Sequence, residues 1–186
     1  MKKGNMLIAQ SGGPTVVINQ SLVGAVLEAR KHKEIKKIYG SLHGLKGILE
    51  ENLCDLGRET RANLELVART PSSALGSVRK KPTPEDCGKV FDVLQLYNIR
   101  YFFLAGGNDT MDTVHRTEKY MREHGWELYG VGVPKTVDND LFGTDHTPGF
   151  GSAARYVTMS VKQAGILARD MRLVGEEYAR RMRWSA

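Results

Sequence analysis

The chain has 186 residues, of which 41% are hydrophobic, and a formal net charge of +6. This length and composition suit one globular domain with a real core, and no apolar run approaches the roughly 20 residues that span a bilayer, which argues against the disordered and membrane-spanning classes. The lysines and arginines are spread along the chain rather than interleaved with aromatic residues, so the charge favours a solvated surface or a small anionic substrate over nucleic acid.

The first predicted element is a short apolar strand at residues 6–9. Residues 1–5 lead into an apolar segment that is too short for a signal peptide, so we expect a cytoplasmic protein. Cys54 and Cys87 agree with this location, because two cysteines without metal-ligand spacing are more often reduced thiols than a disulfide or a zinc site.

A glycine-containing turn, residues 11–15, follows this strand and opens into a helix from about Val16. Leu22, Val26 and Ala29 share one face of that helix, which we expect to pack on the core. Such a turn bares backbone N–H groups at a helix N-terminus, where an anion is stabilised, and glycine lets phosphate oxygens approach the backbone. An ordinary tight connection between a strand and a helix explains the pattern equally well.

Residues 35–39 are predicted to form a second strand, and the glycine-rich residues 40–47 a loop. A helix is predicted at residues 60–69. It should end at Thr70, because the residue before a proline disfavours the helical conformation.

Residues 72–81 combine small side chains with three consecutive cations, Arg79, Lys80 and Lys81. A flexible loop with a basic end could close on a phosphate group, although such a run is more often simply solvated.

Residues 83–86 predict a helix start, with a threonine cap, a proline at the first position and acids in the first turn. Val90, Leu94 and Tyr97 should then face the core. The next segment, residues 99–104, is dense in aromatic and branched residues and is the clearest strand in the chain.

This strand runs into glycines and polar side chains at residues 105–110, and a helix is predicted at residues 111–124. A third buried strand is predicted at residues 128–133, and residues 134–140 follow it. In a doubly wound sheet the carboxyl ends of parallel strands lie on one edge and can converge. We therefore expect residues 105–110 and 134–140 to meet the turn at residues 11–15.

Two acids, a lysine and a hydroxyl group follow the third strand, namely Asp138, Asp140, Lys135 and Thr136. A carboxylate can take a proton from an alcohol while cations hold a phosphate group beside it. The alternative is a surface turn in which aspartate and asparagine side chains satisfy their own backbone.

Residues 149–154 formally fit the dinucleotide-binding fingerprint, but no strand immediately precedes them, so we reject that interpretation. His146 could line a site, although a lone histidine in a loop more often only forms hydrogen bonds. A helix is predicted from beyond Ser152 through Ala164, and a basic tail follows it to Ala186.

Five ordered motifs together resemble those of the phosphofructokinase family, over residues 6–156. They are Ser11 to Thr15 with Asn19, Gly76 to Arg79, Gly106 to Thr110, Pro134 to Asp140, and Gly143 through Ala154. The resemblance implies a three-layer, doubly wound (Rossmann-like) α/β fold with a mostly parallel sheet. It also implies transfer of a phosphoryl group to the 1-hydroxyl of fructose 6-phosphate, a step of glycolysis.

Asp109 and Lys135 bear on the phosphoryl donor. Family members that use ATP typically have glycine at both positions, whereas the diphosphate-dependent members have aspartate and lysine. Asp109 would crowd and repel an α-phosphate, while Lys135 supplies a positive charge near the shorter donor. The resemblance therefore favours diphosphate, and an ATP-dependent enzyme is the alternative.

The resemblance also assigns roles to individual residues. Asn108 stands where many relatives have an aspartate near Mg²⁺, and an amide oxygen can still ligate a hard cation with one negative charge fewer. The assignments are Asp138 as general base with Lys135 and Thr136 as catalytic residues; Gly12, Gly13, Arg79 and Lys135 for diphosphate; Thr136, Val137 and Asp138 for the sugar; and Asn108 and Asp140 for Mg²⁺.

We expect residues 1–150 to form the α/β domain that binds the donor phosphates, and residues 151–186 a helix and basic tail that begin an incomplete sugar-phosphate domain. Relatives are considerably longer, so a C-terminal truncation that removes most of the acceptor site is expected. The implied partners are diphosphate and fructose 6-phosphate, without nucleic acid or membrane, in a homo-oligomer when full length. The alternatives are a relative of NAD and diacylglycerol kinases, an inactive phosphate-binding module and a partly folded fragment.

Overall fold

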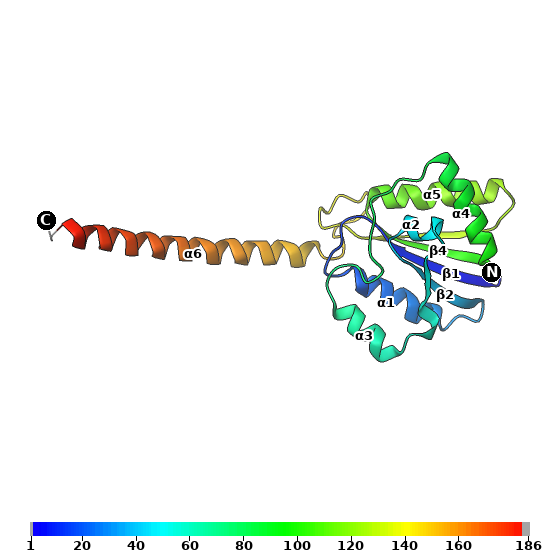
Figure 1. Ribbon diagram of the computed structural model, residues 1–186, viewed down its shortest axis with the longest axis horizontal. Coiled ribbons are helices and arrows are strands. Elements are labelled where there is room, and N and C mark those ends of the chain that lie inside the picture. Colours follow the sequence, from blue (N-terminus) through cyan, green and yellow to red (C-terminus); the bar gives the residue numbers. More distant parts are fainter. Residues whose placement is uncertain (1, 184–186) are drawn as a thin grey trace. The chain divides into compact units, whose positions relative to one another are not determined.

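The computed structural model describes residues 2–183 (Figure 1). The chain divides into two compact units, Met1–Gly149 and Phe150–Ala186. The first unit holds a five-stranded sheet and the helices around it, and the second consists of one helix, α6 (Phe150–Arg183). None of the helices within the described residues is both long and apolar enough to cross a membrane.

The sheet has the strand order β3-β2-β1-β4-β5. β1 pairs in parallel with β2 and β4, and β4 pairs in parallel with β5, while β3 runs antiparallel to β2. The strand bounds are β1 Gly4–Gln10, β2 Ile35–Ser41, β3 Leu53–Asp55, β4 Ile99–Gly106 and β5 Tyr129–Pro134. The predicted mostly parallel α/β sheet is confirmed.

Helices cover both faces of the sheet, which gives the three expected layers. Figure 1 shows α1 and α3 on one face and α4 and α5 on the other. The helix bounds in the first unit are α1 Ile18–Ala29, α2 Leu45–Leu49, α3 Arg61–Arg69, α4 Pro84–Leu96 and α5 Asn108–Glu123, with a 3-10 turn, η1, at Leu56–Arg58.

Alternation along β1 divides the core into two halves. Met6 and Ile8 pack with α1 and α3, whereas Leu7 and Ala9 pack with α2, α4 and α5. All four side chains are fully buried. A parallel strand with helices on both sides must be apolar on both faces, and this explains the continuous apolar run in the sequence.

Two predicted boundaries move at the edge of the sheet that carries the polar loops. α5 begins at Asn108 rather than Met111, with Gly107 at its N-cap, so the polar residues that follow the glycines form the first helical turn. β5 was expected to be buried, but it is the last strand of the described sheet and is only partly buried, with Val131 40% exposed.

Three further boundaries differ from the sequence prediction. α1 begins at Ile18 rather than Val16, and the loop expected at residues 40–47 contains the start of the short helix α2. α6 continues beyond Ala164 to Arg183, because no proline interrupts it. The predicted basic tail is therefore helical as far as it is described, and residues 184–186 lie outside the described part of the chain.

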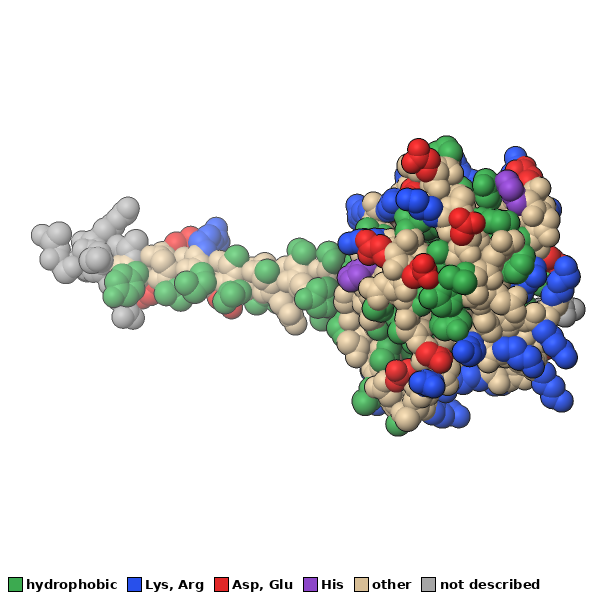
Figure 2. Space-filling model, turned by 45° about the vertical axis from the view of Figure 1, so that its right-hand side comes forward, with side chains coloured by type: hydrophobic (Ala, Val, Ile, Leu, Met, Phe, Trp, Pro, Cys, Tyr) green, Lys and Arg blue, Asp and Glu red, His purple; other side chains and the backbone are tan. Residues whose placement is uncertain are grey.

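α6 carries many exposed apolar side chains, which Figure 2 shows along its length. Among them are Tyr156, Val157, Met159, Val161, Ile166, Leu167, Met171, Leu173, Val174 and Tyr178. Such a helix gains little from packing inside its own unit, so intrinsic helix propensity and exposed pairs such as Arg172 with Glu176 support it.

The start of α4 has the predicted threonine cap, proline and acids, and the structure shows that Thr83 and Asp86 form a reciprocal capping box. The Asp86 amide donates to the Thr83 hydroxyl (3.2 Å), and the Thr83 amide donates to the Asp86 carboxylate (2.9 Å). Lys80 Nζ lies 3.0 Å from the same carboxylate. These hydrogen bonds, first that from the Thr83 amide and then that from Lys80, hold the pKa of the Asp86 carboxyl below its usual value.

Replacing Asp86 by Asn should lower the free energy of unfolding by about 1 kcal/mol at pH 7, since a cap of this kind contributes that much. A depressed folded-state pKa stabilises the fold above the unfolded value of about 4, and this contribution is lost as the pH falls through the lower folded value. Urea unfolding of wild type and Asp86→Asn between pH 7 and pH 2 should therefore converge at the acid end. Glu85→Gln, a change in the same helical turn, is the control, and a deficit that stays constant with pH would contradict this role for Asp86.

Candidate functional site

A cleft of about 480 Å³ lies at the carboxyl ends of β1, β4 and β5. Four segments line it: the loop after β1, the segment before α4, the start of α5 and the segment after β5. The lining residues are Ser11, Gly12, Gly13, Arg79, Lys80, Lys81, Gly107, Asn108, Asp109, Thr110, Thr113, Lys135, Thr136, Asp138 and Asp140. The structure thus brings together the three strand ends that the sequence predicted to meet.

The backbone hydrogen bonds of the sheet continue into two of the segments that line the cleft. The Ser11 amide donates to Ala105 O at 2.8 Å, and the Lys135 amide donates to Gly106 O at 2.9 Å. Both bonds continue the parallel ladders that flank β4. The glycine loop and the Lys135 segment are therefore fixed relative to each other by the central strand.

The two glycines of the first loop leave room for cations. Gly12 has a φ of 77°, which favours glycine, and a Cβ added there would lie 3.2 Å from Lys135 Nζ. A Cβ on Gly13 would lie 3.4 Å from Arg79 Nη2. The positively charged groups of Lys135 and Arg79 therefore lie close to the two glycines of this loop.

Lys135 is a buried cation, with only 5% of its surface exposed. Its Nζ donates to Gly13 O at 2.6 Å. Burial, and then the positive charge of Arg79, lower the pKa of Lys135, while Asp138 opposes this shift. An anion bound beside Lys135 would offset the cost of its buried charge.

Asp138 sits in a turn that is closed by side-chain hydrogen bonds. Its amide donates to the Thr136 hydroxyl at 3.1 Å. Asn139, with a φ of 54°, accepts from the Thr147 amide (2.8 Å) and donates to Asp145 O (2.9 Å). The segment therefore forms the turn with satisfied backbone groups that the sequence offered as one interpretation, and it also places an acid in the cleft.

Asn108 and Asp140 lie in contact. Asn108 Nδ2 donates to the Asp140 carboxylate and to its backbone carbonyl, both at 3.2 Å. Within residues 2–183 no cluster of three or more His, Cys, Asp or Glu side chains is placed to hold a metal ion. One carboxylate beside one amide fits Mg²⁺, which usually takes one or two protein ligands and completes its shell with phosphate oxygens and water.

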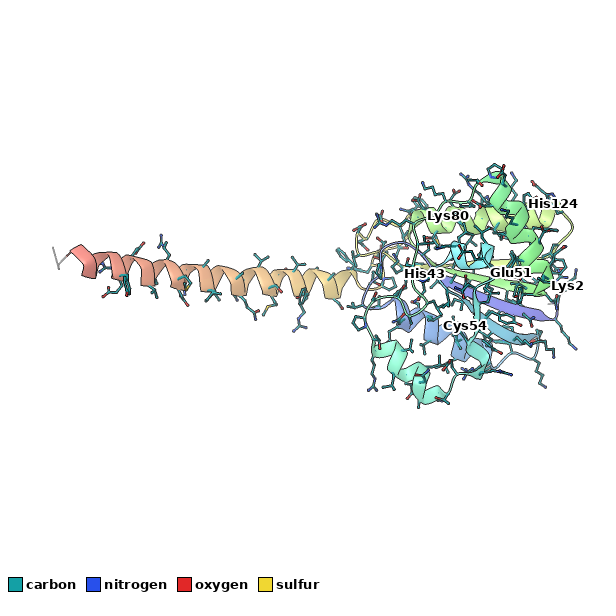
Figure 3. The ribbon with its side chains drawn as sticks, in the orientation of Figure 1. Lys2, His43, Glu51, Cys54, Lys80 and His124 are labelled. Atoms are coloured by element: carbon teal, nitrogen blue, oxygen red, sulfur yellow. The ribbon has the colours of Figure 1, made fainter. Side chains whose placement is uncertain are left out.

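Two further cations of the cleft, Lys80 and Lys81, form ion pairs with carboxylates, whereas within the described residues Arg79 does not. Lys81 lies 2.9 Å from Asp109, and both side chains are 76% exposed. Lys80, labelled in Figure 3, is directed to the capping carboxylate of Asp86. Arg79 makes no hydrogen bond or ion pair with another residue in the described part of the chain.

All the residues expected in the site line this cleft except Val137, whose side chain is 41% exposed. His146 is not among the lining residues either. Thr110 and Thr113 line the cleft although the sequence did not single them out as site residues, because an earlier start of α5 is needed to place both on one helical face. The run of three cations was the signal for Lys80 and Lys81.

Comparison with known proteins shows the family of this chain. The sequence model of the phosphofructokinase family matches residues 5–172. A pyrophosphate–fructose 6-phosphate 1-phosphotransferase of Rhodospirillum rubrum is 52% identical over 160 residues, which cover 86% of this chain and 40% of that protein. An enzyme of the same name from Xanthomonas campestris is 42% identical and is matched over 89% of this chain and 40% of its own length.

A solved structure gives the same result. The crystal structure of a pyrophosphate-dependent phosphofructokinase from Nitrosospira multiformis has a TM-score of 0.83 and 41% sequence identity, over 87% of this chain and 41% of that one. The chain therefore spans about 40% of the length of the relatives that it matches.

Proposed function

The chain belongs to the phosphofructokinase family, and on this basis we propose that it provides the donor site and the general base of a diphosphate–fructose-6-phosphate 1-phosphotransferase. The observation that carries the proposal is the meeting of the buried Lys135, the glycine loop and Asp138 in one cleft. These are the parts that phosphoryl transfer requires, since its rate depends on position and charge more than on covalent chemistry.

In the proposed reaction Asp138 is the base. Its carboxylate takes the proton of the sugar's 1-hydroxyl while that oxygen forms a bond to one phosphorus of diphosphate. The bridging P–O bond breaks, and phosphate leaves with the electron pair. The Thr136 hydroxyl accepts a hydrogen bond from the amide of Asp138 and so holds the base in place.

Lys135, Arg79 and the backbone of the glycine loop stabilise the charge of the donor. Lys135 is already desolvated, so its attraction for a phosphate oxygen is stronger than that of an exposed lysine. We assign Asn108 and Asp140 to Mg²⁺, which would neutralise phosphate charge when bound. Among the described residues that line the cleft, the cations are Arg79, Lys80, Lys81 and Lys135.

Diphosphate is the preferred donor in this proposal. Asp109 lies at the start of α5 on the wall of the cleft. Its carboxylate places a negative charge where a longer donor would extend, and this penalises ATP more than diphosphate.

The direct test is calorimetry of the 186-residue chain with diphosphate or ATP in the presence of Mg²⁺. Diphosphate should bind more tightly than ATP. Production of fructose 1,6-bisphosphate from fructose 6-phosphate, assayed in parallel, shows whether the residues of this chain also suffice for the acceptor. A folded chain that binds no diphosphate would contradict the proposal.

Asp138→Asn should lower kcat by about 10² to 10⁴-fold, which is the usual contribution of general base catalysis, and should leave the affinity for diphosphate within a fewfold of wild type. The rate is measured in the chain extended to the length of its relatives if the 186 residues alone do not turn over. Asp145→Asn, in the same loop but outside the cleft, is the matched control. Near-normal turnover in Asp138→Asn would remove this residue from the role of base.

Replacing Asp109 and Lys135 by Gly should shift the ratio of diphosphate to ATP affinity towards ATP by about tenfold or more, because a repulsive charge and an attractive charge for the short donor both disappear. Lys135→Gly also removes a buried side chain, so thermal unfolding must accompany the binding measurement. Asp112→Gly is the control on α5, since Asp112 pairs with Arg116 at 2.8 Å and does not line the cleft. An unchanged donor ratio in the double variant would count against the assignment of diphosphate.

A further inference from the structure

Two fully buried amide side chains, Gln10 and Asn19, lie beside the cleft without lining it. Gln10 ends β1, and Asn19 lies in the first turn of α1. Gln10 Nε2 donates to Asn19 Oδ1 at 2.9 Å, so the pair joins the strand to the helix. Buried polar groups of this kind are costly unless they are hydrogen-bonded, which makes the partners of their other atoms informative.

Those partners are backbone groups of the segment between α3 and α4. Asn19 Nδ2 donates to Thr70 O at 2.8 Å, and Asn19 Oδ1 accepts from the Ala74 amide at 2.9 Å. Gln10 Oε1 accepts from the Leu75 amide at 2.9 Å. Residues 70–79 form neither helix nor strand, so the two side chains provide hydrogen bonds that a sheet or a helix would otherwise supply.

The anchored segment leads directly into the cleft. The Leu75 side chain is 5% exposed, and its carbonyl accepts from the His43 amide at 2.7 Å; His43 is labelled in Figure 3. Gly76 follows with a φ of 70°, and a Cβ on it would lie 2.5 Å from the His43 ring. Ser77 Oγ then donates to Gly12 O at 2.5 Å. Hydrogen bonds and close packing therefore constrain the backbone between the amide pair and the glycine loop.

Arg79 follows this constrained stretch. Its guanidinium approaches Gly13, yet within residues 2–183 its side chain has no hydrogen bond or ion pair that would hold it there. The backbone that carries Arg79 therefore determines which positions its guanidinium can reach. That backbone depends in turn on the bonds made by Gln10 and Asn19.

We propose that Gln10 and Asn19 are positioning residues for donor-phosphate binding, which act by holding residues 74–79 so that Arg79 faces an anion at the glycine loop. The identity of the ligand, diphosphate, rests on the proposed function. The way in which Gln10 and Asn19 act rests on the hydrogen bonds described above. Neither side chain lines the cleft, so the effect on an anion must be transmitted through the loop.

Asn19→Ala tests the anchoring without any ligand. Amide hydrogen exchange of residues 74–77 should become about tenfold faster or more, because the variant loses the hydrogen bonds of Asn19 to Thr70 O and to the Ala74 amide. The matched control is Asn5→Ala at the opposite end of β1. Asn5 also bonds to two backbone groups, Tyr97 O at 2.7 Å and the Lys37 amide at 3.1 Å. Exchange that is as slow in Asn19→Ala as in wild type would overturn the proposal, whatever the chain binds.

Calorimetry with diphosphate and Mg²⁺ tests the consequence for binding. Arg79→Ala should weaken binding about tenfold or more, as expected for a hydrogen bond to a charged group, and Asn19→Ala should weaken it severalfold. The decisive variant combines both changes: its affinity should equal that of Arg79→Ala, because Asn19 acts through Arg79. Multiplied losses in the combined variant would show a general loss of structure and would overturn the proposal.

Gln10→Met provides a second variant if Asn19→Ala does not fold. It keeps the size of the side chain and removes the acceptor of the Leu75 amide, so it should raise exchange at Leu75 and weaken diphosphate binding. Asn5→Ala should leave the affinity for diphosphate unchanged. A wild-type chain that binds no diphosphate would overturn both the proposed function and the ligand half of this inference, whereas unchanged exchange in the loop would overturn this inference alone.

Discussion

The cleft depends on one partly buried contact, the hydrogen bond from Lys135 Nζ to Gly13 O. It joins the segment after β5 to the loop after β1, which are 122 residues apart in the chain and separated in the sheet by β4. The side chain of Lys135 is largely removed from water, and its ammonium group donates to a carbonyl and forms no ion pair with a carboxylate within the described residues, although the charge of Asp138 partly offsets its burial. Such an arrangement costs free energy in the empty protein, and an anion at the glycine loop removes that cost.

In the other walls of the cleft, neutral hydrogen bonds hold the lining segments in place. Gln10 and Asn19 hold the segment that carries Arg79, and Asn139 and Thr147 close the turn that carries Asp138. Loops of this kind cannot form ladders, so buried side-chain amides and hydroxyls satisfy their backbone groups. The charges of the cleft are thereby presented by loops that are fixed at their bases, and in the proposed function this would keep the geometry for phosphoryl transfer without ordering it at each binding event.

Local patterns in the sequence predicted much of the fold. The apolar run of β1, the density of branched and aromatic residues in β4 and the cap, proline and acids at the start of α4 are signals contained within a few residues, and each predicted its element correctly. The start of α5 was missed because Gly106 to Thr110 has the composition of a turn, whereas in the structure the helix already begins at Asn108. The partial burial of β5 was missed because position in a sheet is a property of the whole fold.

In the site, too, some features follow from local sequence patterns and others only from the whole fold. The resemblance supplied its residues, but no sequence pattern indicates that Lys135 contacts Gly13 or that Gln10 bonds to the amide of Leu75, since both contacts follow from the sheet order. Patterns within a segment therefore identify which residues take part, and the fold determines which of them touch.

In the proposed function, the pairing of Lys81 with Asp109 would let one cleft both attract and limit its donor. Both side chains are largely exposed, so their ion pair contributes about 0 to 1 kcal/mol and an incoming phosphate group can take Lys81 at little cost. Asp109 is then left as an unpaired negative charge at the wall of the cleft. A short donor whose charge is met by Lys135 and Arg79 is little affected, whereas a donor that extends past Asp109 meets an acid whose partner has been removed. Selectivity would thus increase as the donor binds, because the attraction that brings the phosphate in also uncovers the repulsion.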